Sequence, residues 1–505
     1  MIKREIIPKG IARAFWISWA VLFAVQSAAH AQAAQEPEAT TTAPDTLPTA
    51  ETPTAEEQAS STAEVGQEAE PTETAIEPAA TTAPAETAIE PAAATPEPAE
   101  TKIEPAAAPA PQPPPLFKPG LLLQTWARIE DLPAGEEFDT RFTLYMRRIR
   151  ILLSGQINDL VNYFAETDNP NFGKYGDFAP KMFIQDAWVE LNVAPEFQLD
   201  IGMLLLPFSH QGMQGATTLN ALDYHVRLIR YPISQVWRDM GVMARGLLFD
   251  NVLEYRLAVT NGAHPNAKTK TNAAEASYPS DPRNPKDWPR LTARLVLNAF
   301  EPEGVPTVAG FFYKGAYLKE TPEGIISAKK VLALGGSVDW QKGVNVSMQE
   351  VEQDVWEVDE TKDYFAAAAD VFAEIPLSDD KRVALTGQVN FYFYNHGDRK
   401  GLSFYDLEGN KDLYSGVGIA SELGLRYDAI EPIISLDWFN SSKVPDDAGE
   451  IGDYLAVYGG INYFWMAHAL TFKLEVGAQK EPRLSGSEII DKFAPFGTIQ
   501  SQFLF

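Results

Sequence analysis

The residues of this chain that could carry out acid–base or nucleophilic chemistry are few. Asp186 and Glu190 form a pair of carboxylates within QDAWVEL (185–191), a stretch that alternates like a β-strand. Four residues along a strand separate two side chains by about 13 Å, which is too far for the carboxylate pair of a glycosidase. Ser209 and His210 are neighbours, but adjacency alone predicts no catalytic site. We therefore interpret the two carboxylates as lining residues of a polar interior.

The chain also lacks the motifs of the common hydrolases. None of its six histidines lies in H-E-x-x-H, and G-x-S-x-G is absent. The absence of cysteine excludes thiol nucleophiles, zinc–thiolate sites and disulfide frameworks. The sequence therefore predicts a protein that is not an enzyme and that uses no cofactor or metal.

A second group of chemically important residues consists of cations at alternating positions. Arg148 and Arg150 share one face of YMRRIRILLSGQI (145–157), and Ile149, Ile151 and Leu153 occupy the other. An arginine that faces lipid costs about 2–4 kcal/mol at the bilayer midplane, so these side chains are predicted to face an aqueous interior. The candidate pore-lining residues are Arg148, Arg150, Arg245, Arg256, Arg290, Arg294 and Lys314.

Repeated β-hairpins would position these side chains, as residues 238–262 illustrate. Met240, Val242 and Ala244 alternate with Asp239, Gly241, Met243 and Arg245. A short turn follows at 249–251, and a second alternating run ends at Asn261–Gly262 before a long polar loop. One apolar face, one polar face, a short turn and a long loop form the unit of a transmembrane β-barrel.

The repeat predicts an all-β protein, an antiparallel transmembrane β-barrel of 16–18 strands with both termini on the short-turn side. Our best count is 18, and 16 remains an alternative because the strands near 351–375 are weak. The count of 18 includes a strand at 308–317, with Lys314 facing inward, and a hairpin of strands 332–340 and 344–351 over a turn at 341–343.

Residues 207–237 form a long segment that does not fit the repeat. Small and polar residues (SHQGMQGATT) precede DYHVRLIRYP. In large barrels such a loop often folds inward and narrows the pore, and we expect Asp223, His225, Arg227 and Arg230 to hang from it. An outward surface loop is the alternative, and the sequence does not choose between the two.

The chain begins with a predicted signal peptide, residues 1–31. It has a basic start, an apolar run at 15–24 and the cleavage pattern Ala29–His30–Ala31. Residues 32–115 are rich in Ala, Pro, Glu and Thr and repeat ETAIEPAA, which predicts a disordered acidic arm. Residues 116–505 are the predicted barrel domain. No other run of about 18 apolar residues follows the leader.

The net charge of −28 is unevenly distributed. The leader contributes +3 and the arm −15, which leaves −16 for residues 116–505. An acidic barrel domain argues against nucleic-acid binding. It does not fix the selectivity of a pore, because charges in loops and in the lumen have different roles.

The last strand ends in FLF, with Ile499, Phe503 and Phe505 on one face. A terminal aromatic residue on an amphipathic strand resembles the insertion signal of bacterial outer-membrane proteins. We therefore assign Phe503 and Phe505 to that signal and expect the barrel-assembly machinery and outer-membrane lipid as partners.

Taken together, these pieces resemble the phosphate-selective porin (O and P) family of Gram-negative outer-membrane channels. The resemblance covers roughly residues 141–310 best, and it rests on RRIR (147–150), QDAWVEL (185–191), LDIGMLLLPF (199–208), RDMGV (238–242), YRLAVTNG (255–262) and RLTARL (290–295). It implies a homotrimeric, mostly anion-favouring diffusion channel with an infolded third loop. It also implies that Arg148, Arg150, Arg290 and Arg294 line the lumen.

The sequence departs from this family in two respects. Leu204, Leu205 and Leu206 stand before Pro207, where the family leads us to expect a polar or charged residue. Carboxylates share the predicted inner faces with the arginines: Asp186, Glu190, Glu254 and Glu475. Passive diffusion of small hydrophilic solutes or ions, with phosphate as one candidate anion, is therefore the predicted function. The alternative is a structural anchor barrel whose acidic arm contacts the cell wall or a periplasmic partner.

Overall fold

The structure, a computed structural model, describes residues 116–134, 137–179, 181–229, 237–262, 288–304, 312–352, 355–396, 415–442, 453–485, 488–490 and 492–505. The predicted signal peptide (1–31) and acidic arm (32–115) lie outside the described residues. Within them, no helix is long and apolar enough to cross a bilayer.

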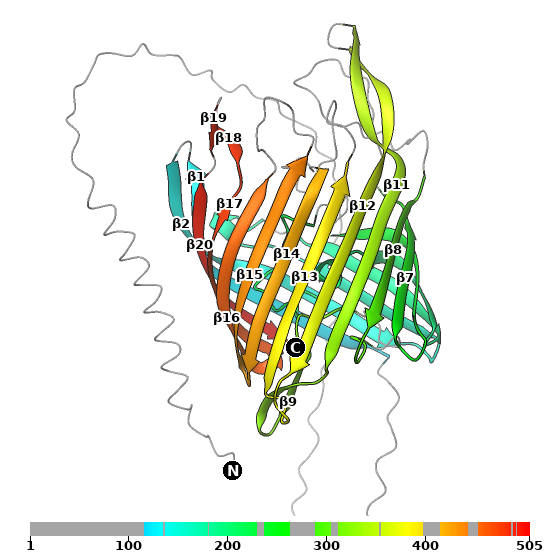
Figure 1. The fold of residues 1–505 in the computed structure, drawn as a ribbon, viewed down its shortest axis with the longest axis vertical. Coiled ribbons are helices and arrows are strands. Elements are labelled where there is room, and N and C mark those ends of the chain that lie inside the picture. The colour runs from blue at the N-terminus through cyan, green and yellow to red at the C-terminus, as the bar shows by residue number, and fades with distance from the viewer. Residues whose placement is uncertain are drawn as a thin grey trace, which may run out of the picture. The chain divides into compact units, whose positions relative to one another are not determined.

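The described chain forms a closed antiparallel β-barrel (Figure 1). Each barrel strand pairs with the next one along the chain, and β1 (Lys118–Ala134) pairs with β20 (Phe493–Leu504) to close the ring. The strands between them are β2 (Glu137–Gln156), β3 (Val161–Asp168), β4 (Phe183–Ala194), β5 (Phe197–Leu205), β6 (Arg238–Leu248), β7 (Leu253–Thr260), β8 (Arg290–Asn298), β11 (Val331–Glu352), β12 (Val355–Pro376), β13 (Val383–Asn395), β14 (Ser415–Tyr427), β15 (Ile430–Ser442), β16 (Tyr454–His468) and β17 (Leu470–Lys480).

Two small hairpins and two single-turn 3-10 helices lie in the described connections. The hairpins are β9 (Leu318–Thr321) with β10 (Gly324–Ser327), and β18 (Arg483–Ser485) with β19 (Glu488–Ile490). The helices are η1 (Lys174–Gly176) and η2 (Gln211–Met213).

The barrel has 16 strands, so the fold class is confirmed and the best count of 18 was too high. Residues 312–317 are not a barrel strand: in this segment only Tyr313 makes a β-bridge, to Gln214. The predicted strands 332–340 and 344–351 are one strand, β11, which passes 341–343 with an irregular register instead of turning. A polar Gln-Lys-Gly sequence resembles a turn, but here it belongs to a long β11–β12 hairpin.

The prediction that both ends of the barrel domain lie on the short-turn side is confirmed. Connections of one to four residues (157–160, 195–196, 249–252, 428–429 and 469) lie at one end of the barrel. At this end the backbones of Leu121 and Phe505 exchange two hydrogen bonds of 3.0 and 3.2 Å. One connection at the same end is long: residues 299–330, between β8 and β11, carry the β9–β10 hairpin.

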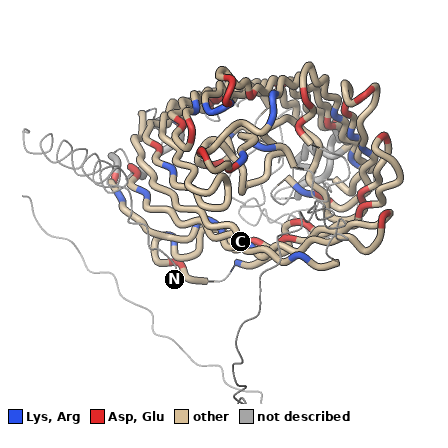
Figure 2. The backbone as a smooth tube through the Cα atoms, turned by 90° about the horizontal axis from the view of Figure 1, so that it is seen from below, with Lys and Arg blue, Asp and Glu red and all other residues tan. Residues whose placement is uncertain are grey.

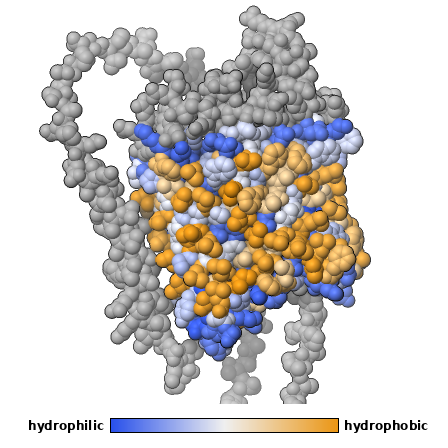
Figure 3. Space-filling view, in the orientation of Figure 1, coloured by the Kyte–Doolittle hydropathy of each residue, from blue (hydrophilic) through white to orange (hydrophobic). Residues whose placement is uncertain are grey.

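The outer face of the barrel is an apolar band between two hydrophilic rims (Figure 3). On β14, Val417, Leu423 and Leu425 are exposed on this face, while Glu422 and Arg426 alternate with them and point inward. Strand periodicity therefore separates a lipid-facing surface from a charged interior.

Leu423 offers a test of this register. We expect Leu423→Arg to reduce the free energy of folding into lipid vesicles by about 2–4 kcal/mol, because the guanidinium would enter the hydrocarbon region. Urea titration of folding into vesicles measures the change, and Leu423→Ala is the control for loss of the leucine side chain. Equal stability of the two variants would contradict the outward placement.

Candidate functional site

The inward face of the barrel carries most of the predicted pore-lining residues. Arg148, Arg150, Arg245, Arg256, Arg290 and Arg294 all point into the lumen and are at most 3% exposed. Lys314 does not lie on a strand; it is exposed on the 299–330 connection, with its ammonium group 5.9 Å from the centre of the Tyr317 ring.

Each inward arginine has a carboxylate beside it. The pairs join Arg150 to Glu166 (2.7 Å) and Asp168 (2.8 Å), Arg238 to Asp186 (2.9 Å), Arg245 to Asp200 (2.8 Å) and Glu190, Arg256 to Glu254 (2.7 Å), Arg290 to Asp339 (2.7 Å), Arg294 to Asp370 (2.6 Å) and Arg426 to Glu374 (2.6 Å). A buried charge is tolerated only when it is paired, so this wall is locally close to neutral.

The Arg294–Asp370 pair crosses a strand and depends on a glycine. Arg294 lies on β8 and Asp370 on β12, and Gly335 of the intervening β11 lies beneath their contact. A Cβ at Gly335 would lie 2.3 Å from Asp370 Oδ1 and 2.4 Å from Arg294 Nη2. The glycine therefore gives the two side chains the room in which they meet.

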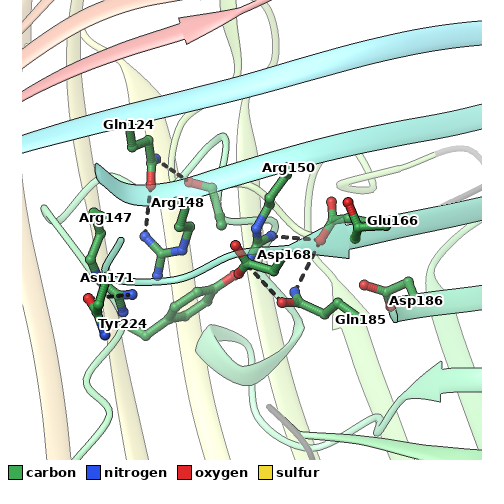
Figure 4. A network of polar contacts seen from close by, with 12 residues as sticks. Gln124, Arg147, Arg148, Arg150, Glu166, Asp168, Asn171, Gln185, Asp186 and Tyr224 are labelled. Carbon is green, nitrogen blue, oxygen red and sulfur yellow. Dashed lines mark hydrogen bonds and ion pairs between the residues drawn. The ribbon is translucent and has the colours of Figure 1, made fainter. Parts of the chain in front are cut away.

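An arginine that the sequence reasoning missed joins this wall at a β-bulge. The register of β1 against β2 shifts between Gln124 and Thr125, so no residue of β1 lies opposite Arg147. As a result, the side chains of Arg147 and Arg148 both turn inward. Arg147 Nε lies 2.8 Å from Asp223, and Arg148 also pairs with Asp223. Arg148 Nη1 also donates to Gln124 Oε1 of β1 at 2.8 Å (Figure 4). The adjacent arginines of RRIR were a signal for this bulge, because a regular strand cannot turn both to one side.

Residues 206–229, here called the inner loop, lie inside the barrel. Figure 2 shows chain crossing the interior of the ring of strands. The loop contacts strands all around the wall: Gln124 of β1 donates to Ala216 O (3.3 Å), Asn220 to Thr386 of β13 (3.2 Å), and Lys473 of β17 to Leu219 O (2.6 Å). These contacts show that the inner loop spans the lumen from one side of the wall to the other.

Two predicted loop residues bind charged partners on the wall. Burial alone would raise the pKa of Asp223, but the guanidinium groups of Arg147 and Arg148 outweigh it and hold that pKa well below its usual range. His225 lies between Glu422 of β14, at 2.8 Å, and Asp437 of β15. Burial lowers the pKa of His225, but these two carboxylates outweigh burial and raise it to about 10. His225 is therefore a cation at neutral pH.

The remaining predicted residues lie elsewhere. Arg227 is half-buried and pairs with Glu481 at 3.1 Å, and Arg230 lies outside the described residues. Phe503 and Phe505 are exposed at the end of the chain, and their rings stack 6.5 Å apart.

His210, whose sequence context predicted nothing, is fully buried in the inner loop. Its ring stacks on Phe372 (4.3 Å) and Tyr313 (4.9 Å), and its nitrogens contact Glu303 (2.8 Å) and Gln388 (3.1 Å). These neighbours come from different parts of the chain, so no local sequence signal could have found them.

Comparisons with known proteins agree with the sequence resemblance. The family described as phosphate-selective porin O and P matches residues 121–286, which confirms the resemblance over that part of the chain. This match and the closed barrel indicate a channel protein of the Gram-negative outer membrane. No curated protein matches the chain.

Several solved structures share low similarity with the chain. Pseudomonas putida OprB at high pH has a TM-score of 0.47 at 8% identity, over 77% of this chain and 94% of that one. Salmonella typhi OmpF in complex with daunomycin gives 0.45 at 11%, over 77% and 97%. The outer membrane channel DcaP of Acinetobacter baumannii gives 0.43 at 10%, over 77% and 97%.

The wall can be tested at Gly335. We expect Gly335→Ala to lower the free energy of unfolding by about 1–3 kcal/mol, because the added methyl group must separate Arg294 from Asp370. The matched control is Gly336→Ala, since a Cβ at Gly336 meets no atom within 4 Å. Unfolding in urea from detergent micelles measures both; equal effects would mean that the pair does not lie over Gly335.

The His225 contacts predict a pH dependence. A pKa raised from 6.5 to about 10 means that the stabilisation is complete below pH 6.5 and is lost as pH rises through about 10. We expect His225→Gln to lower the free energy of unfolding, measured by urea titration, by roughly 3–5 kcal/mol at pH 6, the usual effect of breaking a buried ion pair. At pH 10.5 the loss should be much smaller, because the wild-type imidazole is then largely neutral. A difference between wild type and variant that stays constant with pH would argue against a cationic His225.

Proposed function

We propose, from the match of residues 121–286 to a porin family, that the chain is a passive diffusion channel for small hydrophilic solutes or ions. The observation that carries this proposal is a closed barrel whose inward face is polar and charged and whose outward face is apolar. Diffusion through such a lumen needs no covalent chemistry, and the family and the fold suggest a channel rather than an enzyme.

We further propose that the channel discriminates weakly between ions of opposite sign. Selectivity for phosphate needs cations available to the solute. Here the carboxylates beside Arg150, Arg290 and Arg294 balance their charges.

The primary experiment is planar-bilayer conductance of the refolded protein across a salt gradient. Stable steps with a small reversal potential would support a weakly selective pore. A strongly anion-selective reversal would support the porin but refute weak selectivity. Absence of steps from a folded barrel would refute the pore and favour the anchor barrel with a working acidic arm.

Asp223 gives a sharper test of charge balance. We expect Asp223→Asn to shift the reversal potential towards the value of an anion-selective channel, because Arg147 and Arg148 lose their shared carboxylate. Its control is Asp380→Asn, which removes a carboxylate from an exposed turn outside the lumen. Equal shifts in both variants would show that Asp223 does not act on the permeation path.

The assignments of other segments remain proposals. Residues 1–31 would direct export, and residues 32–115 would form an acidic arm. The terminal aromatic residues Phe503 and Phe505 would be read by the barrel-assembly machinery, and the exposed apolar band would contact outer-membrane lipid. Homotrimerisation comes from the family resemblance, and cross-linking of the detergent-solubilised protein would test it.

A further inference from the structure

A second part of the chain enters the lumen, from the end opposite the long loops. Residues 312–317, here called the inserted segment, belong to the 299–330 connection at the short-turn end. Tyr313 and Ala316 are fully buried, and Tyr317 is 5% exposed, although none of them lies on a barrel strand. The segment therefore occupies interior space of the barrel.

The inserted segment is hydrogen-bonded to the inner loop by backbone groups. Tyr313 N donates to Met213 O (3.0 Å), Gly215 N to Tyr313 O (3.1 Å), and Gly315 N to Thr218 O (2.9 Å). Gly315 permits this approach, since a Cβ there would lie 2.3 Å from the backbone nitrogen of Asn220. The two segments form one structure although they start from opposite ends of the barrel.

Side chains fix the inserted segment to the wall. The Tyr313 hydroxyl donates to Glu254 of β7 (2.7 Å) and accepts from Arg294 of β8 (3.2 Å). On the opposite side of the segment, His468 at the end of β16 lies 2.8 Å from Ala316 O. Contacts to well-separated strands place the segment across the lumen rather than along one wall.

An apolar patch of the wall receives the inserted segment. Phe312 packs edge-on against Phe164 of β3, with 5.7 Å between ring centres. It also packs against the buried cluster that Phe164 forms with Trp188, Leu204 and Met243. The interior of a porin is ordinarily polar, so an apolar patch there requires an apolar partner. This explains Leu204, where the family resemblance predicted a polar residue.

We propose that the inserted segment is the second half of the channel constriction and that it sets the size limit together with the inner loop. The inference rests on the proposed diffusion function. It makes residues 312–317 specificity-determining, and it locates part of the filter on a connection at the short-turn end.

Removal of the inserted segment is the first test, and the structure shows where the 299–330 connection can be shortened without disturbing the barrel strands. Glu301 N donates to Lys330 O (3.0 Å) and Ala299 N to Leu332 O (2.9 Å), so β8 and β11 already face each other there. Replacing residues 302–329 by Asn-Gly would close a two-residue hairpin. We expect conductance to rise at least about twofold and larger neutral sugars to enter proteoliposomes.

The matched control shortens the same connection but keeps the inserted segment. Lys319 and Ile326 are partners in the β9–β10 register, so Asn-Gly can replace residues 320–325. This variant should keep the conductance and size limit of the full chain. An unchanged size limit in the 302–329 variant, with the barrel shown to be folded by its heat-dependent electrophoretic mobility, would overturn the inference.

A cysteine pair tests where the segment lies in the conducting channel. An ideal Cβ at Gly215 lies 3.6 Å from Phe312 Cβ, within disulfide range, and the chain contains no other cysteine. We expect Gly215→Cys/Phe312→Cys to form a disulfide without changing conductance relative to its reduced form, with each single variant as control. A fall in conductance on oxidation, or failure of the disulfide to form, would overturn the inference.

The test separates this inference from the proposed function. If the full chain does not conduct but the shortened chain does, the inserted segment blocks the lumen and only passive diffusion through the full chain is refuted. If both chains conduct equally, the diffusion function stands and the inference fails. If neither conducts, both fail.

Discussion

Charge burial is the constraint on which the interior of this protein depends. Arginines placed on the inward face avoid lipid, but the lumen is crowded enough that they are almost inaccessible to water. An unpaired charge in such surroundings is very costly, so each one requires a carboxylate. Most carboxylate partners come from another strand, as with Arg290 of β8 and Asp339 of β11. The ion pairs therefore connect strands in addition to the backbone hydrogen bonds of the sheet. Asp223 and His225 extend the same rule to the inner loop.

Much of the barrel follows from strand periodicity alone. A period of two separates Arg148 and Arg150 from Ile149 and Ile151, and only one orientation keeps the arginines out of lipid. Turn chemistry was less informative. Residues 341–343 have turn-like composition but continue a strand, because β11 and β12 pair well beyond that point. Alternation at 308–317 was misread as a barrel strand. Its described residues, 312–317, lie inside the lumen, where buried and exposed side chains also alternate in part, as Tyr313 and Lys314 do.

The candidate site was predictable only as a list of inward residues. Nothing local in the sequence connects Asp370 to Arg294, or His225 to Asp437, since the barrel brings them together across other strands or across the lumen. The bulge that turns Arg147 inward changes a single position, which periodicity cannot detect. The inserted segment was hidden because its partners, Met213 and Phe164, precede it by about 100 and 150 residues.

The seam of the barrel has a consequence for the order of assembly. Gln124 of β1 and Gln502 of β20 hydrogen-bond to each other (2.7 Å), and each also donates to the inner loop, at Ala216 O and Thr217 O. The first and last strands thus meet over a loop from the middle of the chain. A closed ring would have to admit that loop through a mouth, whereas an open sheet can wrap around it. We therefore expect the inner loop to be in place before β20 pairs with β1 and closes the barrel around it.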